Sequence, residues 1–290
     1  MSGGEALLRP KLVHRLAEMA RRVGVKSSVL SGLFFANHST IPKNIEKAIR
    51  SVDHFSVSTD IFHEAEVPRR NVFKTLETVL SYGSHVSIHI VGRDQDDPYL
   101  LEVTEEIQEN FGESVPILVN SLSSFGRARD WLKVDGKKQR PLVQAMPCTM
   151  AAWPVMSYDG TIVACGNDDA IDHLPKHLYL GHAQKHSWQQ ISEKTRKSYI
   201  LRAIRLFGPD YIAQTYSDEK NTCDGYCETC MALSSDATLE KHLQTIMQRN
   251  STHTMEELVL SMHQQGGAES FIRSQGVAKY ASLAILGAPT

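Results

Sequence analysis

The sequence has no cysteine before residue 148, no apolar run as long as a membrane span, and no strong excess of either charge. A spanning helix needs about 18 apolar residues, and the N-terminus lacks the layout of a signal peptide. The net charge of −2 comes without a long basic run, which argues against nucleic acid or an anionic membrane as a partner. We therefore expect a cytoplasmic protein whose 41% apolar content fills one large core or two smaller ones.

The cysteines that are present fall into two groups. There are five of them, at Cys148 and Cys165 and then at Cys223, Cys227 and Cys230. In a reducing compartment disulfides are rare, and grouped thiols hold metal or carry out redox chemistry. The grouping therefore predicts a metal centre in the second half of the chain.

Helical and strand patterns alternate from residue 10 to about residue 130. Strand-like runs begin near residues 25, 54, 85 and 115, and amphipathic helical runs lie between them. The spacing of about 30 residues is that of one βα unit, which predicts an α/β fold with a parallel sheet. The loops after the strands would gather at one end of the sheet, where α/β proteins bind ligands.

The pattern changes in the second half of the chain. Residues 133–141 are polar and read as a boundary, and two strand-like runs flank Asp159-Gly160 as a hairpin. The C-terminal third is mostly helical. We expect domains at 1–132 and 133–235 and a helical extension at 236–290.

The cysteine spacing suits three kinds of site. Cys227 and Cys230 form a Cys-x2-Cys pair, which can hold an iron–sulfur cluster or zinc, and independent buried thiols are the third possibility. If the hairpin turns at Asp159-Gly160, Cys165 lies across from Pro154 rather than from Cys148. The residues between must then coil back for the two sulfurs to share a metal.

The order of several motifs resembles a known family. The arrangement Cys148–x11–Gly160–x4–Cys165 followed by "CDGYCETC" resembles the SPASM/twitch extension of radical S-adenosylmethionine (radical SAM) enzymes. "GGEALLRP", "FSVSTDIFHE", "SSFGRARDW" and "YLGHAQKHSWQQI" resemble further motifs of that family, in its order. The resemblance implies a partial (β/α) barrel missing its first strand, followed by a cysteine-rich SPASM/twitch domain.

The resemblance also implies roles for individual residues. Glu5 in the GGE motif would meet the amino group of S-adenosyl-L-methionine, although a solvated charge ahead of a helix is the alternative. The residues expected to bind this cofactor are Gly3, Gly4, Glu5, Ser58, Asp60 and Arg127. One auxiliary [4Fe–4S] cluster is expected on Cys148, Cys165, Cys227 and Cys230, and Cys223 could replace one of these ligands. No catalytic residue is assigned.

Other residues have less specific expectations. His63 and Glu64 could face substrate. His173, His177, His182 and His186 are interrupted by Pro175 and Gly181, so a polar loop is a better interpretation than a zinc site. Trp153 and Trp188 are expected to pack in the core.

The family carries a Cys-x3-Cys-x2-Cys loop before GGE, and here only two residues precede Gly3. We therefore expect the natural protein to be longer, since loss of the first strand would expose a sheet edge and apolar helix faces. The full-length form would cleave S-adenosyl-L-methionine to a 5′-deoxyadenosyl radical that abstracts hydrogen from a substrate.

The substrate could be a peptide or a small molecule, and flavodoxin or ferredoxin is the expected electron donor. The chain alone is expected to be inactive. A non-catalytic iron–sulfur scaffold is the alternative function, and a zinc-binding module is the third.

Overall fold

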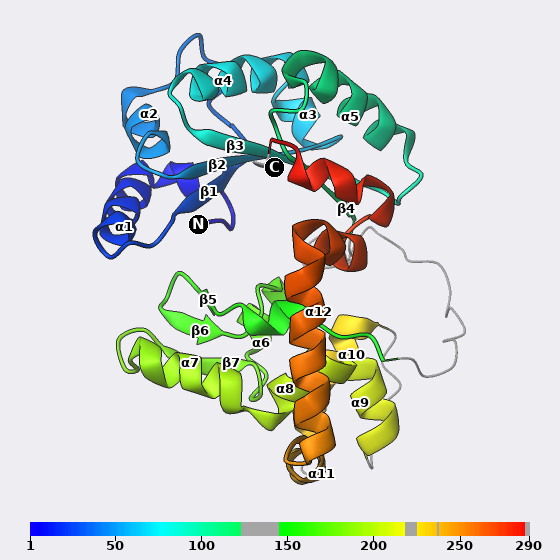
Figure 1. Cartoon of the computed structure of the whole chain (residues 1–290). Helices are drawn as coiled ribbons and strands as arrows, with labels where there is room; N and C mark the ends of the chain where they lie inside the picture. The colour runs from blue at the N-terminus through cyan, green and yellow to red at the C-terminus, as the bar shows by residue number, and fades with distance from the viewer. Residues whose placement is uncertain (123–144, 218–224, 237, 288–290) are drawn as a thin grey trace. The chain divides into compact units, whose positions relative to one another are not determined.

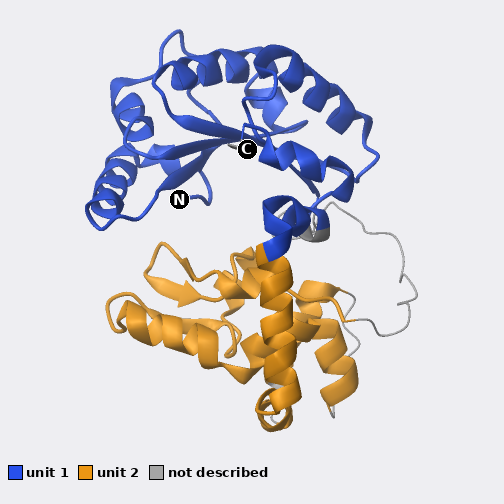
Figure 2. Cartoon of the chain, in the orientation of Figure 1, with its two compact units in different colours: residues 1–122, 265–290 blue, residues 123–264 orange. Residues whose placement is uncertain are grey.

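The structure is a computed structural model that describes residues 1–122, 145–217, 225–236 and 238–287. The chain divides into two compact units, residues 1–122 with 265–290 and residues 123–264 (Figure 2). This division differs from the expected helical extension at 236–290, because residues 236–264 belong to unit 2 and residues 265–290 return to unit 1. The expected linker at 133–141 lies outside the described residues.

Unit 1 is built on a four-stranded parallel sheet in the order β1-β2-β3-β4 (Figure 1). The strands are β1 (Ser28–Ser31), β2 (His54–Asp60), β3 (His85–Gly92) and β4 (Ile117–Ser121). The α/β class and the parallel sheet expected from the 30-residue spacing are confirmed.

Helices precede β1 and fill the connections between the strands. They are η1 (Ala6–Leu8), α1 (Pro10–Arg22), α2 (Lys43–Ile49), α3 (His63–Glu66), α4 (Arg69–Ser81) and α5 (Pro98–Phe111). Asp97 caps α5 by accepting a hydrogen bond from Tyr99 N at 3.0 Å, and Gly112 ends it at a φ of 58°. An acidic or amide cap at the start and glycine at the end are what free helix termini favour.

The two faces of the sheet differ in chemistry. Side chains alternate along a strand, and paired residues of parallel strands share a face. One face carries Phe55, Val57, Ile88, Ile90, Ile117 and Val119, each no more than 1% exposed. The other face is polar and carries His54, Ser56, Ser58, Ser87, His89 and Asn120.

The polar face has its own hydrogen bonds. Ser87 Oγ lies 2.9 Å from His54 Nε2 and 2.9 Å from Ser56 Oγ. Burial lowers the pKa of His54 and of His89, and the charges of neighbouring histidines lower them further. This face therefore presents neutral imidazoles and hydroxyls.

The β1 edge of the sheet is partnered by the first residue of the chain. Met1 N donates to Ser28 O at 2.6 Å, and Leu30 N donates to Met1 O at 3.0 Å. These two bonds flank Val29 in the manner of a parallel strand pair. Beside this edge, α1 buries Val13 and Ala17 but leaves three larger side chains of its apolar pattern exposed, namely Leu12, Leu16 and Met19.

Unit 2 combines a small antiparallel sheet with helices. Its strands are β5 (Val155–Met156), β6 (Thr161–Val163) and β7 (Tyr179–His182), in the order β5-β6-β7. Its helices are η3 (Thr149–Ala152), α6 (Asp168–His173), α7 (Trp188–Lys197), α8 (Tyr199–Phe207), α9 (Pro209–Tyr216), α10 (Tyr226–Ala232), η4 (Leu233–Ser235) and α11 (Leu239–Met247). Its core gathers on α8 through Leu201, Ala203 and Ile204.

The predicted hairpin is present with a one-residue shift. Val155 pairs with Val163, and Ser157 N donates to Thr161 O at 2.8 Å, so the loop is Tyr158-Asp159-Gly160. Gly160 takes the left-handed conformation, with a φ of 92°, that a three-residue loop requires. Continued outward, this register sets Cys165 across from Trp153 rather than Pro154.

The chain passes from unit 2 back to unit 1 within its last long helix. α12 (Asn250–Gln275) breaks its helical backbone at Gly267, where φ is 63°. After it, Val277 N donates to Val119 O at 3.4 Å, and η5 (Ala278–Ile285) packs on β4. Among the described residues, no helix has both the length and the apolar character of a membrane span.

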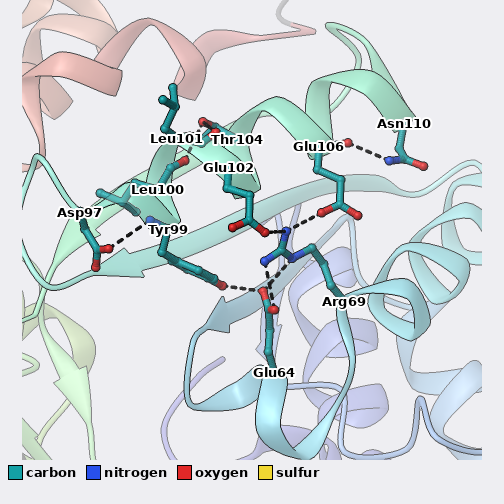
Figure 3. A network of polar contacts seen from close by, with 10 residues as sticks. All are labelled: Glu64, Arg69, Asp97, Tyr99, Leu100, Leu101, Glu102, Thr104, Glu106 and Asn110. Carbon is teal, nitrogen blue, oxygen red and sulfur yellow. Dashed lines mark hydrogen bonds and ion pairs between the residues drawn. The ribbon is translucent and has the colours of Figure 1, made fainter.

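A charged network holds the segment that follows β2. Arg69 forms ion pairs with Glu64 at 2.8 Å, with Glu102 at 3.0 Å and with Glu106 (Figure 3). Tyr99 adds a hydrogen bond from its hydroxyl to Glu64 Oε1 at 2.7 Å. Because the Arg69 side chain is only 11% exposed, its charge depends on these carboxylates.

We predict that Arg69→Ala destabilises unit 1 by about 2 kcal/mol, because it leaves partly buried Glu64 without its cation. The exposed Lys74→Ala on the same helix is the matched control and should change stability by less than about 0.5 kcal/mol. Urea unfolding measures both. Equal free energies of unfolding for the two variants would show that the Arg69 ion pairs do not stabilise unit 1.

Candidate functional site

The segment carrying the first cysteine is anchored to α8. Met146 N donates to Phe207 O at 3.0 Å, and Cys148 N donates to Ile204 O at 3.1 Å. The chain then turns through η3 before it enters the hairpin. This turn supplies the coil between Cys148 and Cys165 that the hairpin geometry requires.

The last turn of α8 is also where the later cysteines approach. Tyr226, the first residue of α10, donates its hydroxyl to Met146 O at 2.5 Å. Gly208 follows α8, and a Cβ there would lie 1.8 Å from Met146 O. Glycine is therefore needed for this contact, which brings the helix of Cys227 and Cys230 to the Cys148 segment.

The charges of neighbouring thiols contribute to the raised pKa of three cysteines, Cys165, Cys227 and Cys230. Burial raises the pKa of Cys227 to about 11, with further contributions from the charges of Cys165 and Cys148. Burial and the other three thiols raise the pKa of Cys230, and burial and Cys148 raise that of Cys165. The two groups of cysteines are thus near enough to repel one another as thiolates.

Polar groups without partners lie among these cysteines. Asn167 caps α6 through Oδ1, which accepts from Asp169 N at 2.9 Å. Its side chain lowers the pKa of Cys227, yet its buried Nδ2 completes no hydrogen bond. Thr149 Oγ1, beside Cys148, and His177 Nδ1 are also buried and unpaired within the described structure.

The histidines of residues 173–186, expected to lie in a polar loop, have different surroundings. His177 is 9% exposed and sets Nε2 3.8 Å from Cys230 Sγ, and burial lowers its pKa to about 4. His186 instead accepts from His182 N at 3.1 Å in the turn after β7. Within the described ranges, no group of three or more His, Cys, Asp or Glu side chains is arranged to hold a metal ion.

A second polar site forms at the carboxyl end of β1. Glu5 Oε2 accepts from Ser31 Oγ at 3.0 Å and from Gly32 N at 2.9 Å. Its Oε1 accepts from Leu7 N at 2.9 Å. A carboxylate has about four acceptor positions, so Oε1 keeps one for a further donor. Gly3 and Gly4, both exposed with positive φ, precede this residue.

Asp60 and His63 form a pair at the end of β2. Asp60 Oδ2 lies 2.6 Å from His63 Nδ1, and Oδ1 accepts from the main-chain nitrogens of Phe62 and His63 at 2.8 Å each. The hydrogen bond to Asp60 raises the pKa of His63, against the effect of burial. Burial alone would raise the pKa of Asp60, but the bonds from His63 lower it.

These two groups meet over Gly32. A Cβ on Gly32 would lie 3.2 Å from His63 Cδ2, 3.4 Å from His63 Nε2 and 3.8 Å from Glu5 Oε2, so a side chain there would crowd the His63 ring. Ser58, half-buried, shares the polar face of β2 with Asp60. The structure thus brings Glu5, Ser58 and Asp60 to one sheet, with His63 beside them.

Other predicted residues have different outcomes. Arg127 and Cys223 lie outside the described residues. Glu64 is held by Arg69 and Tyr99 and positions the loop of His63. The expectation that Trp153 and Trp188 pack in the core is wrong, because they are 56% and 67% exposed.

Sequence reasoning missed Tyr226, Asn167 and Gly208, which organise the surroundings of the cysteines. Tyr226 could have been noticed inside "CDGYCETC" and Asn167 two residues after Cys165. The sequence matches no protein-family model, and no curated protein matches it.

We predict that Tyr226→Phe lowers the stability of unit 2 by about 1 kcal/mol, because it removes the hydrogen bond to Met146 O. Tyr158→Phe is the control, since Tyr158 is fully exposed at the hairpin tip and should show no change. Guanidinium unfolding compares the two. Unfolding midpoints that agree would contradict the role given to Tyr226.

We predict that Asp60→Asn lowers the pKa of His63, because an amide cannot balance the imidazolium. The pair's contribution to stability is fully present below pH 6.5 and is lost as the pH rises through the raised pKa of His63. A pH titration of the imidazole resonances by NMR measures the shift. The exposed Glu77→Gln should leave the titration unchanged, and an unaltered pKa in Asp60→Asn would disprove the pairing.

Proposed function

We propose that the chain is an iron–sulfur protein in which Cys148, Cys165, Cys227 and Cys230 hold one [4Fe–4S] cluster. The observation that carries the proposal is the hydrogen bond from Tyr226, beside Cys227, to the carbonyl of Met146, two residues before Cys148, which joins segments 80 residues apart in sequence. The thiol charges that raise the pKa of Cys227 and Cys230 agree with it. Two anchors on Met146 O and α8 support the same convergence.

The chemistry of the surroundings fits such a group. The four cysteines are partly buried, and a metal deprotonates the thiols that coordinate it and so offsets the repulsion between thiolates. A core of four irons offers a separate corner to each thiolate, so the sulfurs stand further apart than around one zinc ion. When bound, such a cluster supplies electron transfer or an open site for substrate.

Unpaired donors near the thiols support the proposal further. The reduction potential of an iron–sulfur cluster depends on hydrogen bonds to its sulfurs and on its burial. Asn167 Nδ2 and Thr149 Oγ1 are buried donors of this kind. His177 would position Cys230 through its Nε2.

We further propose that unit 1 is the partial (β/α) barrel of a radical SAM protein and unit 2 its SPASM/twitch domain. The parallel sheet, its polar face and the meeting of Glu5 with His63 over Gly32 support this proposal. Glu5 would receive the ammonium group of S-adenosyl-L-methionine on its remaining acceptor position, and Ser58 would reach the ribose. Asp60, whose acceptor positions are mostly used by His63 and Phe62, would position His63 instead.

S-adenosyl-L-methionine supplies a 5′-deoxyadenosyl radical in radical SAM enzymes, and the substrate of such a radical would be a peptide or a small molecule. Flavodoxin or ferredoxin would supply the electron. A non-catalytic iron–sulfur scaffold is the second candidate.

Anaerobic reconstitution with iron and sulfide tests the cluster. We expect four irons and four sulfides per chain, with a visible charge-transfer absorption. Cys148→Ser and Cys230→Ser should each lose most of the bound iron, because each removes a ligand. Cys223→Ser is the matched control and should retain it. Zinc bound without sulfide, or equal iron in all variants, would overturn the proposal.

Binding of S-adenosyl-L-methionine tests unit 1 separately. We expect Glu5→Gln to weaken binding about tenfold, the value of one charge-assisted hydrogen bond, and Glu77→Gln to have no effect. Calorimetric titration measures this. The chain with only its auxiliary cluster should form no 5′-deoxyadenosine, and formation of that product would contradict the assignment of "CDGYCETC" as auxiliary.

A further inference from the structure

A basic groove lies on unit 2 between α7, α8 and α12. Its volume is about 430 Å³, and it is lined by Arg196, Lys197, Tyr199, Arg202, Arg205, His253 and Glu256. Four of these side chains are cations and one is an anion. None of them belongs to the two sites described above.

The single carboxylate of the groove is already used. Arg202 Nε donates to Glu256 Oε1 at 2.9 Å and Arg202 Nη2 to Glu256 Oε2 at 2.5 Å, which is a two-point ion pair. Arg202 also donates to Met247 O at 3.0 Å. Glu256 therefore neutralises Arg202, and Lys197 Nζ pairs with Glu193 Oε1 at 2.5 Å, whereas Arg196 and Arg205 form no ion pair within the described part of the chain.

Arg205 is the most poorly balanced of these cations. Its Nη1 donates to Ala151 O at 3.2 Å, and no carboxylate in the described part of the chain forms an ion pair with it. Burial lowers the pKa of Arg205, the charge of Glu256 opposes this effect and repulsion from Arg202 adds to it, although an arginine keeps its proton. A partly buried guanidinium with donors to spare is costly unless an anion meets it.

Two neighbours offer further donors to such an anion. Tyr199 accepts a hydrogen bond from Gln248 Nε2 at 2.9 Å, so its hydroxyl proton is available to donate. Arg196 is exposed, and its Nε makes one long contact of 3.4 Å to Ser192 O. The donors of Arg205, Arg196 and Tyr199 thus line one open groove.

We propose that this groove binds a small organic phosphate. Guanidinium groups bind phosphate oxygens through paired hydrogen bonds, and a phosphate dianion offsets more of the surplus charge than one carboxylate does. The groove is of the size that holds small-molecule ligands, so there is room for an organic group beside the phosphate. The proposal is independent of the iron–sulfur function.

Calorimetric titration of the full chain with pyrophosphate at constant ionic strength tests the proposal. We expect saturable binding of one pyrophosphate, weakened about tenfold in Arg205→Gln and in Arg196→Gln, since each loses a charge-assisted hydrogen bond. Tyr199→Phe should weaken binding less. The control is Lys185→Gln, which removes one exposed positive charge outside the groove and should bind as the unchanged protein does.

Three outcomes would overturn the proposal. The first is an equal loss of pyrophosphate affinity in Lys185→Gln and Arg196→Gln, which would show a diffuse charge effect. The second is binding of citrate as tight as that of pyrophosphate, and the third is the absence of saturable binding. Arg205→Gln is checked for folding by circular dichroism. If it fails to fold, the pyrophosphate affinities of Arg196→Gln and Tyr199→Phe test the proposal instead.

Discussion

The short main-chain contact between residues 146–148 and the end of α8 is the constraint on which the cysteine site depends. It fixes Cys148 against α8, a largely buried helix of unit 2. The carbonyl of Met146 also accepts a hydrogen bond from the hydroxyl of Tyr226. The close approach is possible only because residue 208 has no side chain. Main-chain groups therefore bring together segments that are distant in sequence. Most substitutions leave such contacts in place, and the contacts position the cysteines that these segments carry. Arg205 extends the same anchoring, since it bonds the carbonyl of Ala151 from α8 while facing the basic groove.

Unit 1 depends on an asymmetry within one sheet. The face carrying Phe55 and Ile88 buries its side chains almost completely and supplies the hydrophobic stabilisation. The opposite face carries serines and neutral histidines that hydrogen-bond to one another. At the carboxyl ends of the strands, Asp60 orients His63 and Glu5 closes the loop after β1. The Arg69 network holds Glu64, the residue that follows His63, through the ion pairs drawn in Figure 3.

Local patterns in the sequence predicted the elements well. The 30-residue spacing placed the parallel strands, and Asp159-Gly160 marked the hairpin. The register was wrong by one residue, because the sequence does not distinguish a two-residue loop from a three-residue loop with Gly160 in the left-handed conformation. The return of residues 276–285 to β4 could not be predicted, since it depends on the edge that β4 leaves open. The role of Tyr226 was also missed, because its hydrogen-bond partner is 80 residues away in the sequence and local patterns do not reveal such a contact. Exposed Trp153 and Trp188 show that an aromatic residue in an amphipathic pattern is not always buried.

The central claim is that four thiols from two distant segments surround a single inorganic core. Native mass spectrometry of the chain, purified anaerobically from cells and not reconstituted, tests it most directly. The account predicts a bound mass of four irons and four sulfides that is released on unfolding. A chain carrying one zinc ion, or no inorganic mass after anaerobic purification from iron-replete cells, would contradict it.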